Sequence, residues 1–415
     1  MQKVIIIGGG IIGLSTAYYL NKAGAEVTVL DKGSIDDNCS FGNAGMIVPS
    51  HFVPLAAPGM LEQGIRWMFD SKSPFYVRPT LNLDLVKWGL KFIKSATAAH
   101  VNRSAVPLRD LSILSKALYQ DIAKEPGFDF GLANNGILML YKTEKAGEEE
   151  VHLAEKARAL GLDVEALSAE QARALQPQLN LDVAGAVHYR CDSHLAPHVL
   201  MRRLTAYLET AGVKISRGSE VIKIDHQQAK ITNIHTHTET FQADEVVIAG
   251  GAWSPAITKL IGLNVPLMPG KGYSFMYDEP QQRMSIASLL MEARVSVTPM
   301  GNQVRFGGTM ELGAMNNKVN MNRVKGIVEA IPKYFPDLSP AIPEAEKIWH
   351  GFRPCSPDGL PYIGRSGKYQ NLLVAGGHGM MGLSLGPATG KLITEMIQGH
   401  TLSMQTGAFN PDRYS

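Results

Sequence analysis

Short apolar runs and an amphipathic stretch alternate along the first thirty residues. Residues 3–7 (KVIII) form an apolar run typical of a buried strand, and residues 26–31 (EVTVLD) predict a second strand. Between them, residues 14–24 (LSTAYYLNKAG) follow a helical pattern that ends at Gly24. The order strand, helix, strand predicts the start of a parallel sheet with helices on its faces.

Two later segments repeat this arrangement. Residues 245–251 (EVVIAGG) are followed by a turn and a helix start at Ser254-Pro255, and we expect this unit to return to the N-terminal sheet. Residues 372–377 (LLVAGG) lead through a glycine-rich turn into the helical stretch 385–397. This last unit is predicted to be another strand–turn–helix element.

The pattern changes between residues 265 and 312, where short alternating runs are separated by turn residues. Alternation with a period of two predicts an antiparallel sheet, which we interpret as a second domain inserted between segments of the first. Helices are predicted at residues 110–125, 148–161, 168–179 and 321–336. The third begins with a capping-box pair, Ser168 and Gln171, and Pro332 marks the expected end or kink of the fourth.

Length, charge and cysteine spacing limit the classes of protein to which this chain can belong. A chain of 415 residues is more than one compact core usually contains, so two domains are expected. A net charge of +2 gives no electrostatic basis for binding nucleic acid. The three cysteines, Cys39, Cys191 and Cys355, lie far apart without metal-ligand spacing, so reduced thiols in a cytoplasmic protein are expected. His235 and His237 alternate with threonines and lack a neighbouring acidic or cysteine cluster, which favours an exposed strand over a metal site.

The apolar N-terminal run could be mistaken for a signal peptide. Only Lys3 supplies charge before it, no small-residue cleavage site follows, and four glycines interrupt it. No other stretch is long and apolar enough to span a bilayer, so a soluble or peripheral protein is expected. Six aromatic residues are interpreted as core or lid residues, with a membrane-touching patch as the alternative: Trp67, Phe69, Phe75, Tyr76, Trp88 and Phe92.

The first strand and helix are joined by a G-x-G-x-x-G motif, residues 8–13. Gly8 permits the tight turn, Gly10 lets the backbone approach a pyrophosphate, and Gly13 lets the helix pack against the sheet. The helix N-terminus offers free N–H groups to the phosphates. Asp31, at the end of the second strand, can accept hydrogen bonds from a ribose hydroxyl. These features in this order predict a dinucleotide site.

The motif alone does not distinguish NAD from FAD. Its position at the extreme N-terminus favours FAD, and so does the small, glycine-rich segment 38–49 (NCSFGNAGMIVP). Its residues Ser40, Asn43 and Gly45 could bind a phosphate or the flavin edge, although a plain loop is an equal alternative. The turn HGMMGLS (378–384) precedes a helix, whose positive N-terminus would suit a flavin that gains negative charge on reduction.

Taken together, these features resemble the D-amino-acid oxidase superfamily of FAD-dependent amine oxidoreductases, and within it the bacterial D-amino-acid dehydrogenase group. The resemblance covers nearly the whole chain. It is carried by GGGIIG with Asp31, SFGNAGMIVP (40–49), LAAPGM (55–60), KGYSF (271–275), RFGGTME (305–311), GFRP with SPDG and IGR (351–365), and GHGMMGLS (377–384).

The resemblance implies an α/β fold (α+β overall) in which a Rossmann-like FAD-binding domain carries an inserted antiparallel-sheet substrate domain. The FAD-binding domain is expected to be discontinuous, with residues 1–50, 185–262 and 345–415. Residues 51–184 and 263–344 are expected to form the substrate-binding domain with helical lid elements.

The resemblance also implies the positions of the site residues. FAD would lie along Gly8, Gly10, Gly13, Asp31, Lys32, Ser40, Asn43, Ala44, Gly45, Met46, Val221, Gly250, Gly379, Met380, Met381, Gly382, Leu383 and Ser384. Arg353 would pair with the substrate carboxylate, where the alternative is that it holds the local turn through backbone carbonyls. Tyr273 would assist it, and His51 is a further catalytic candidate, weighed against an ordinary loop histidine. Gly351 occupies the position where some relatives attach flavin through cysteine, so noncovalent FAD is expected and no metal is required.

The implied reaction is the oxidative deamination of a D-amino acid, with hydride leaving the α carbon for flavin N5 and electrons passing to a quinone or protein carrier. His51-Phe52 replaces a glycine-aromatic pair of the D-alanine-type enzymes, so D-proline or a D-hydroxyproline is a candidate substrate. An oxygen-using glycine- or sarcosine-type amine oxidase is the first alternative, and a non-catalytic or tRNA-modifying flavoprotein is the second. A cytoplasmic location is expected, with peripheral contact to the inner membrane as an extension of it.

Overall fold

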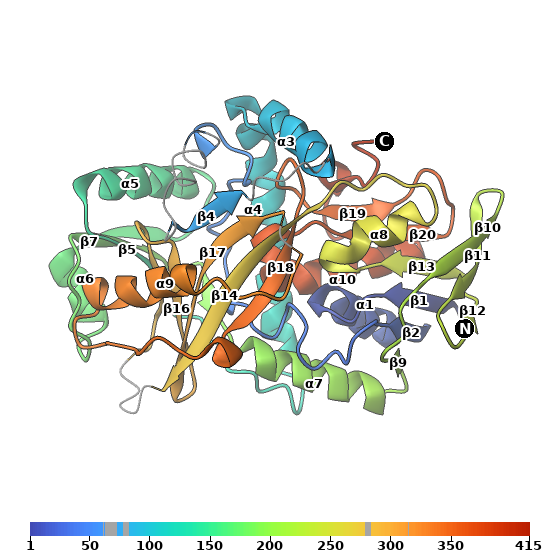
Figure 1. Ribbon diagram of the computed structural model, residues 1–415, viewed down its shortest axis with the longest axis horizontal. Helices are drawn as coiled ribbons and strands as arrows, with labels where there is room; N and C mark the ends of the chain where they lie inside the picture. Colours follow the sequence, from blue (N-terminus) through green and yellow to red (C-terminus); the bar gives the residue numbers. More distant parts are fainter. Residues whose placement is uncertain (61, 63–72, 78–82, 279–283, 314) are drawn as a thin grey trace.

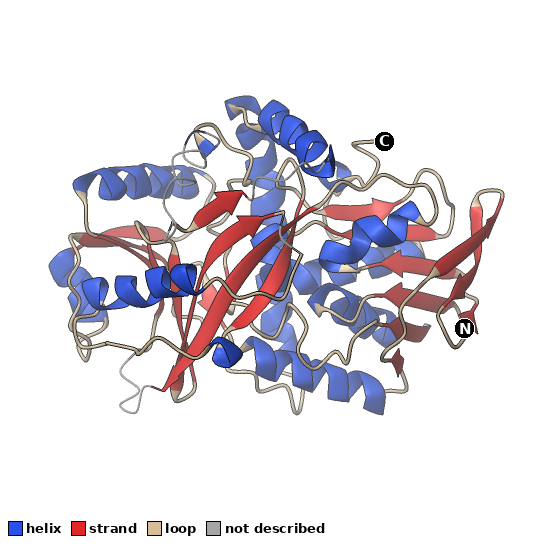
Figure 2. Cartoon of the chain, in the orientation of Figure 1, coloured by secondary structure: helices blue, strands red, loops and turns tan. Residues whose placement is uncertain are grey.

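The computed structural model describes residues 1–60, 62, 73–77, 83–278, 284–313 and 315–415. These residues fold around two large sheets that lie side by side, a mainly parallel sheet of six strands and a mixed sheet of nine (Figures 1 and 2). Trp67 and Phe69, which were interpreted as core or lid residues, lie outside the described residues.

The six-stranded sheet is centred on β1 (Lys3–Ile7), which pairs in parallel with β2 (Glu26–Leu30) and β13 (Glu245–Ile248). Beyond them lie the parallel strands β20 (Leu372–Gly376) and β9 (Lys214–Ser216), and β19 (Tyr362–Arg365) closes one edge in antiparallel orientation. The predicted return of residues 245–251 to the N-terminal sheet is therefore confirmed.

Both faces of this sheet are buried, which explains why β1 is a continuous apolar run. On one face Val4 and Ile6 join a core that is shared with helices of the same domain. On the other face Ile5 and Ile7 pack into a separate cluster with the small sheet β10–β11–β12. The elements on the two faces are α1 (Ile11–Lys22), α4 (Ala98–Ile122), α7 (Pro197–Thr210), α8 (Ser254–Lys259), α10 (Gly382–Gln398), β10 (Lys223–Gln227), β11 (Lys230–His235) and β12 (Thr240–Phe241).

The nine-stranded sheet contains the predicted alternating region. Its central strands are antiparallel, as expected, but β15 pairs in parallel with β5, and β17 pairs in parallel with β4, so the sheet is mixed. Its strands are β18 (Trp349–Cys355), β14 (Met268–Asp278), β17 (Gln303–Leu312), β16 (Val295–Met300), β15 (Ala287–Leu290), β5 (Ile137–Tyr141), β7 (Gly185–Tyr189), β6 (Val164–Ser168) and β4 (Phe75–Val77).

Two strands lie in a different sheet from the one that the expected domain boundaries suggest. β7 begins at Gly185 and β18 at Trp349, yet both pair within the nine-stranded sheet and not with the cofactor sheet. The stretch around Arg353, which one alternative treated as a local turn, is a strand that pairs with β14 over seven residues. Its glycines and prolines obscured the strand pattern, because they are turn signals in isolation.

Helices cover the nine-stranded sheet and enclose a second core. Two of them, α6 (Ala169–Leu175) and α9 (Met321–Tyr334), pack into this second core, whereas α5 (Glu144–Ala159) packs into a separate cluster with β5 and β7. The capping box of Ser168 and Gln171 at the start of α6 is confirmed. Pro332 lies in the last turn of α9, which ends two residues later at Tyr334, so the expected end is nearly correct.

The remaining elements are short or peripheral. α3 (Leu83–Ser95) lies along the top of the molecule (Figure 1). The small antiparallel pair β3 (Met46–Ile47) and β8 (Ser193–His194) brings the segment after residue 47 close to the turn before residue 193. Four 3₁₀ turns complete the described chain: η1 (Gly251–Trp253), η2 (Ala345–Lys347), η3 (Gly379–Met381) and η4 (Gly407–Phe409).

Candidate active site

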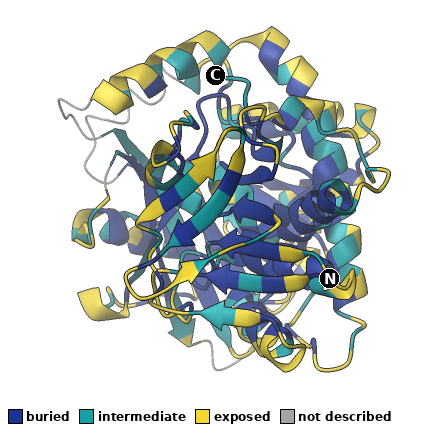
Figure 3. Ribbon diagram, turned by 90° about the vertical axis from the view of Figure 1, so that its right-hand side faces the viewer, coloured by how far each residue is buried: buried dark blue, intermediate teal, exposed yellow. Residues whose placement is uncertain are grey.

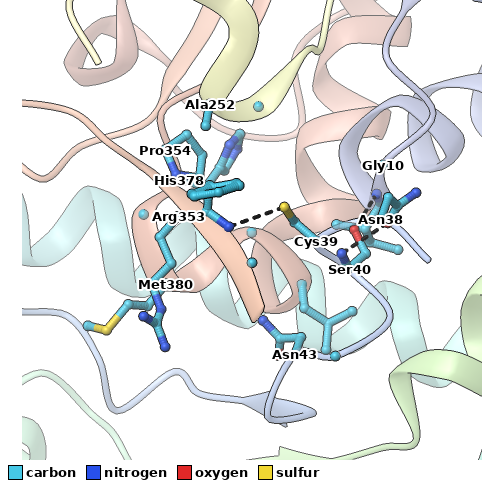
Figure 4. A pocket seen from close by; sticks show the side chains of 18 of the residues that line it. Gly10, Asn38, Cys39, Ser40, Asn43, Ala252, Arg353, Pro354, His378 and Met380 are labelled. Carbon is cyan, nitrogen blue, oxygen red and sulfur yellow. Dashed lines mark hydrogen bonds between the residues drawn. The ribbon is translucent and has the colours of Figure 1, made fainter. Parts of the chain in front are cut away.

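A cavity of about 1330 Å³ is lined by the ends of β1, β2 and β13 and by β14, β17 and β18 (Figure 4). Most of the predicted site residues line it: Gly8, Gly10, Asp31, Lys32, Ser40, Asn43, Ala44, Met46, His51, Val221, Gly250, Tyr273, Arg353, Gly379, Met380, Met381, Gly382 and Leu383. The other three, Gly13, Gly45 and Ser384, do not line the cavity.

The turn between β1 and α1 has no space for side chains. Gly8 adopts φ +118°, and a Cβ atom there would lie 2.4 Å from the carbonyl oxygen of Ala249. A Cβ atom on Gly13 would lie 1.9 Å from the carbonyl oxygen of Gly8, so this glycine lets α1 pack on the turn. Gly10, the N-cap of α1, has no side chain that could cap the helix, so the N–H groups of the first turn other than that of Ile11 remain available to a phosphate.

Asp31 holds the backbone that surrounds this turn. Its Oδ2 accepts a hydrogen bond from Gly9 N–H at 2.6 Å, and its Oδ1 accepts one from Gly33 N–H at 2.7 Å. A carboxylate oxygen has two lone-pair sites, so both oxygens can still accept a ribose hydroxyl. The ammonium group of Lys32 lies 4.1 Å from the ring centroid of Trp253, at the same end of the cavity.

The segment after residue 38 uses its side chains to brace the turn. Ser40 Oγ accepts a hydrogen bond from Ile11 N–H at 3.0 Å, so it caps the start of α1 from outside the helix. Asn38, which the sequence analysis did not single out, donates to the Gly9 carbonyl and accepts from Ser40 N–H. Asn43 Oδ1 accepts from Gly45 N–H at 2.9 Å. The expected binding segment is therefore an ordered wall.

The turn before α10 forms the opposite wall. Gly379 adopts φ +54°, and residues 379–383 line the cavity in front of the first turn of α10. Ser384 faces away and accepts a hydrogen bond from Val48 N–H at 3.0 Å, which ties this turn to the segment after β3. Burial lowers the pKa of His378 to about 3, and its Nε2 pairs with Thr389 Oγ1 at 2.9 Å. His378 thus supports the turn as a neutral side chain.

Arg353 reaches the cavity from β18. Its Nη1 donates a hydrogen bond to the Thr309 carbonyl at 2.7 Å, and its guanidinium lies over the backbone of Gly272. Within the described part of the chain it forms no ion pair with a carboxylate. Burial lowers its pKa, partly offset by the thiols of Cys355 and Cys39. An arginine remains charged at neutral pH, so the site holds a half-buried cation that can bind an anion.

Thr309, which accepts from Arg353, has an unusual backbone. Its φ is +61°, which is rare for a β-branched residue, and its hydroxyl has no partner among the described residues. The pairing of β14 with β17 shifts register between Lys271 and Tyr273, so Thr309 lies in a β-bulge opposite Gly272. The bulge aims the Thr309 carbonyl at the guanidinium and fixes its orientation.

Tyr273 lines the cavity, but its hydroxyl group is engaged elsewhere. It donates to Glu311 Oε1 at 2.9 Å and accepts from Asn320 N–H at 3.1 Å. Burial raises its pKa, and the Glu311 carboxylate adds to the rise. Because both its donor and an acceptor site are used in this network, the structure offers no support for its expected contact with a substrate carboxylate.

His51 also lines the cavity, on the turn that follows β3. Its Nδ1 lies 3.0 Å from Ser50 Oγ, and Ser50 Oγ donates to Asp192 Oδ2 at 2.6 Å. Burial and the positive charge of Arg294 lower the pKa of His51 to about 4, so the imidazole is neutral at pH 7. Ser50, Asp192 and Arg294 were not predicted from the sequence. Ser50 directly precedes His51, but Asp192 and Arg294 come from distant parts of the chain and have no local signal.

The indole of Trp349 occupies the space beside Gly351. A Cβ atom on Gly351 would lie 2.2 Å from this ring, and one on Gly42 would lie 1.9 Å from it. A cysteine at position 351 would therefore displace Trp349. Cys355 Sγ contacts the Arg353 carbonyl at 3.6 Å, and burial raises the pKa of this thiol to about 12, so it is not poised for covalent attachment.

Cys39 lies at the cavity wall beside the arginine strand. Its Sγ accepts a hydrogen bond from Phe352 N–H at 3.2 Å (Figure 4). Burial raises the pKa of the Cys39 thiol, although Arg353 and Lys32 act in the opposite direction. The three cysteines are free thiols, as expected.

Other sequence expectations concern metals and membranes. The described residues contain no cluster of histidine, cysteine and acidic side chains that could hold a metal. His235 lies on β11 and contacts Asp225 at 2.7 Å and Thr240 at 2.9 Å.

Trp88 is buried, with its Nε1 donating to the Cys355 carbonyl, so it is a core residue. No described helix combines the length and hydropathy needed to cross a bilayer.

Known proteins share both the sequence pattern and the fold. Residues 3–396 match the DAO family, described as FAD dependent oxidoreductase. A D-amino acid dehydrogenase of Helicobacter pylori is 32% identical over 398 residues, which cover 96% of this chain and 95% of that protein. A D-amino acid dehydrogenase of Neisseria meningitidis is 28% identical and covers 100% of both chains.

Solved structures agree in fold. Glycine oxidase from Geobacillus kaustophilus superposes with a TM-score of 0.78 at 24% identity, covering 100% of both chains. L-proline dehydrogenase from P. horikoshii gives a TM-score of 0.76 at 18% identity, covering 100% of this chain and 97% of that one. The expected family, fold class and FAD cofactor are confirmed. The chain belongs to the DAO family of FAD-dependent oxidoreductases, and it is an amine oxidoreductase.

Proposed function

We propose that this protein is a D-amino-acid dehydrogenase, which oxidises the Cα–N bond of a D-amino acid and passes the electrons to an acceptor other than oxygen. The observation that carries the proposal is the Arg353 guanidinium, a half-buried cation at the cavity without a carboxylate partner among the described residues. The names of the relatives from Helicobacter pylori and Neisseria meningitidis support the choice of D-amino acids.

The residues that line the cavity suit the chemical groups of FAD. Gly8 and Gly10 would take the pyrophosphate at the N-terminus of α1, and Asp31 would take the ribose. Residues 379–383 would hold the ring system next to the N-terminus of α10. The bound flavin supplies a two-electron acceptor for the hydride of the substrate. The Trp349 indole fills the space beside Gly351, which supports noncovalent binding of FAD. Acid precipitation of the protein tests this, because noncovalent FAD is released into the supernatant with all of the yellow colour.

Arg353 would fix the substrate by its carboxylate. One N–H is held by the Thr309 carbonyl, and the other donors of the guanidinium remain for a bidentate carboxylate pair. A fixed carboxylate leaves one orientation for the Cα–H bond, which is the main requirement of hydride transfer. The alternative, in which Arg353 only holds the local backbone, accounts for the bond to Thr309 but not for the half-buried charge that faces a cavity.

The substrate side chain is proposed from the neighbourhood of His51. Phe52 is buried in the core, so of the His51-Phe52 pair only His51 lines the cavity. A polar ring at this place would suit a compact or hydroxylated substrate, which supports D-proline or a D-hydroxyproline as candidates.

The test is an anaerobic panel of D- and L-amino acids, including prolines and N-methylglycine, followed by flavin absorbance. Bleaching by at least one D-amino acid is expected. Arg353→Ala should keep FAD and raise the apparent KM for that substrate by about 10²-fold, because a charge-assisted pair is lost. Loss of FAD with unchanged substrate affinity would exclude the carboxylate role.

An oxygen-using amine oxidase is the competing function. The glycine oxidase structure shares the fold, but at 24% identity it carries no information about the electron acceptor. Stoichiometric hydrogen peroxide during turnover in air would favour the oxidase. Reduction of a soluble quinone without peroxide would favour the dehydrogenase.

The outer face of α3 supports a membrane-bound acceptor such as a quinone. Four apolar residues spaced three or four apart are each at least half exposed: Leu83, Val86, Leu90 and Ile93 (Figures 1 and 3). The same helix carries Lys87, Lys91 and Lys94, which complement anionic lipid headgroups. An apolar stripe flanked by lysines is typical of a helix that lies in a membrane interface. We therefore propose peripheral contact with an anionic bilayer through α3.

A further inference from the structure

Three side chains form a connected line that starts at the cavity and ends in the protein interior. His51 Nδ1 lies 3.0 Å from Ser50 Oγ, and Ser50 Oγ lies 2.6 Å from Asp192 Oδ2. Ser50 N–H also donates to Asp192 Oδ1 at 3.0 Å. Pairing of Met46 with His194, between β3 and β8, sets this arrangement, because it brings the segment after β3 against the turn before β8.

The directions of these hydrogen bonds fix the tautomer of the histidine. Asp192 accepts, so the Ser50 hydroxyl hydrogen points to its carboxylate. The Ser50 oxygen then offers only lone pairs to His51, which must carry its proton on Nδ1. His51 Nε2 is therefore the unprotonated nitrogen, and in the described part of the chain it has no hydrogen-bond partner. A base with a free lone pair lines the substrate cavity.

We propose that Ser50 and Asp192 form a proton relay behind His51, through which the proton of the substrate ammonium group leaves the cavity. The relay rests on the proposed amino acid oxidation, which needs a neutral amine because its lone pair assists hydride departure. One N–H bond of the ammonium breaks, its electron pair stays on nitrogen, and His51 Nε2 gains the proton. The Nδ1 proton moves to Ser50 Oγ, and the hydroxyl proton of Ser50 moves to Asp192 Oδ2.

This sequence of transfers leaves no new charge on the histidine. His51 returns to a neutral imidazole of the opposite tautomer, and the net change is one neutral amine and one neutral carboxylic acid. No oxidant or reductant takes part. Asp192 is thus the proton acceptor, Ser50 is a positioning and conducting residue, and His51 is the group that would touch the substrate.

The charges around the line favour this division of roles. Burial and the cation Arg294 oppose a positive His51 and lower its pKa to about 4, so it is a poor final acceptor. Burial raises the pKa of Asp192 to about 7, against the lowering effect of Ser50, the Cys191 thiol and Lys116. Lys116 lies on α4 and donates to the Cys191 carbonyl at 2.7 Å. The carboxylate can therefore take a proton near neutral pH.

Other titratable groups face the same region. Burial raises the pKa of Tyr189, on β7, and the charge of Asp192 raises it further, so the Tyr189 hydroxyl stays protonated. Glu150, on α5, lies near Arg294, and burial raises its pKa to about 7. A pH effect assigned to Asp192 must therefore be separated from one due to Glu150.

The experiment compares Ser50→Ala, Ser50→Thr and Asp192→Asn with wild type in the FAD-loaded enzyme. The substrate is the D-amino acid that bleaches wild type fastest, and the readout is the rate of anaerobic flavin reduction from pH 5 to 10. In wild type this rate should rise with pH through about 7, because the relay needs an ionised Asp192. Ser50→Ala and Asp192→Asn should lose this step and be slower at pH 7 by about 10²-fold, with KM little changed.

Two comparisons separate a relay from a structural brace. Ser50→Thr keeps the hydroxyl and should retain the wild-type profile. Cys191→Ala removes another donor to Asp192, at 3.5 Å, but stands outside the line to His51, so it should keep the pH step. Above the pKa of the substrate amine no proton must be removed, so the difference between wild type and Ser50→Ala should vanish there. Glu150→Gln should also retain the step.

A second readout does not depend on catalysis. The ¹⁵N chemical shifts of His51 in the FAD-loaded enzyme, assigned by comparison with His51→Gln, should show a protonated Nδ1 and an unprotonated Nε2. A protonated Nε2 would overturn the relay, and so would a pH-independent loss of rate in Ser50→Ala. If no amino acid reduces the flavin, the proposed function fails, whereas reduction with an unaffected Ser50→Ala variant defeats the relay alone.

Discussion

The guanidinium of Arg353 lies over the backbone of Gly272 on the neighbouring strand, where a Cβ atom would be 2.1 Å from Nη1 and 2.4 Å from Nη2. β18 and β14 pair so that Arg353 faces Gly270 and Gly351 faces Gly272. The arginine therefore turns its side chain along the strand pair, across a position that only glycine leaves open. Gly272 and the bulge at Thr309 together determine where the charge points.

Replacement of Gly272 by alanine should move the guanidinium and weaken substrate binding. The backbone at this position is not left-handed, so alanine itself is tolerated and the clash with Arg353 is the main effect. We expect the apparent KM to rise about 10- to 100-fold, as for the loss of one or two charge-assisted hydrogen bonds, while FAD stays bound. Steady-state kinetics and the flavin-to-protein absorbance ratio measure both effects.

Gly407→Ala is the matched control, because a Cβ atom there meets nothing within 4 Å. It should leave KM and FAD content at the wild-type values. An unchanged KM in Gly272→Ala would show that Arg353 can reach a substrate from another position, and the proposed carboxylate site would then need a different geometry.

A second glycine substitution tests the packing around Gly351, the position at which some relatives attach flavin through a cysteine. Gly351→Ala places a methyl group 2.2 Å from the Trp349 ring and should reduce the free energy of unfolding by about 1–3 kcal/mol through overpacking. Trp349→Ala removes the ring and should itself be destabilising. In the double variant the clash disappears, so the two losses should not add.

Urea unfolding of the two single variants and the double variant gives this coupling as a double-mutant cycle. A favourable coupling of about 1 kcal/mol or more is expected. Strictly additive losses would mean that Trp349 does not occupy the space beside Gly351 in solution.

Much of the cofactor sheet could be predicted from the sequence because its signals are local. β1 is apolar throughout because both of its sides are buried, and Gly8 and Gly13 are required within one short turn. β18 was missed because Gly351 and Pro354 indicate a turn when read alone. In the sheet, Gly351 instead makes room for Trp349, which is a tertiary effect with no local pattern.

In the candidate site, too, the residues with a local sequence signal could be predicted, whereas their distant partners could not. Arg353 was found through a motif, but its partner Thr309 is 44 residues away and is placed by a bulge that has no sequence signature. Asp192 meets Ser50 across 142 residues. Tyr273 was expected to contact the substrate, but its hydroxyl hydrogen-bonds Glu311 and Asn320. The sequence could not show this, because the partners of a strand residue come from distant parts of the chain.

The buried histidine of the flavin turn should make stability depend on pH. Burial lowers the pKa of His378 to about 3, whereas an unfolded histidine titrates near 6.5. As pH falls below about 6.5 the unfolded chain binds the proton first, so the full stability is present above that pH and declines towards pH 3. The contribution of one such group is about 1.4 kcal/mol per pH unit.

Wild type and His378→Gln should therefore differ in the slope of unfolding free energy against pH between about 6 and 4, with the shallower slope in the variant. Comparing the two isolates His378 from Asp192 and Glu150, whose raised pKa values act in the opposite direction. Urea unfolding at saturating FAD supplies the measurement. His400→Gln, at an exposed histidine, should keep the wild-type slope. Parallel curves for wild type and His378→Gln would show that His378 takes up its proton in the folded state.

The exposed stripe of α3 should determine binding to anionic membranes. Leu90 and Ile93 are 64% and 50% exposed, and each would gain about 1–2 kcal/mol on entering the acyl boundary. Leu90→Glu combined with Ile93→Glu should therefore weaken binding to phosphatidylserine-containing vesicles by about 10²-fold, measured by co-sedimentation.

Ile342→Glu, which changes an exposed apolar residue outside α3, should bind like wild type. Because Lys87 and Lys94 contribute by charge, wild-type binding should also weaken in high salt and on pure phosphatidylcholine. Equal binding of the double variant and wild type would mean that α3 does not contact the bilayer.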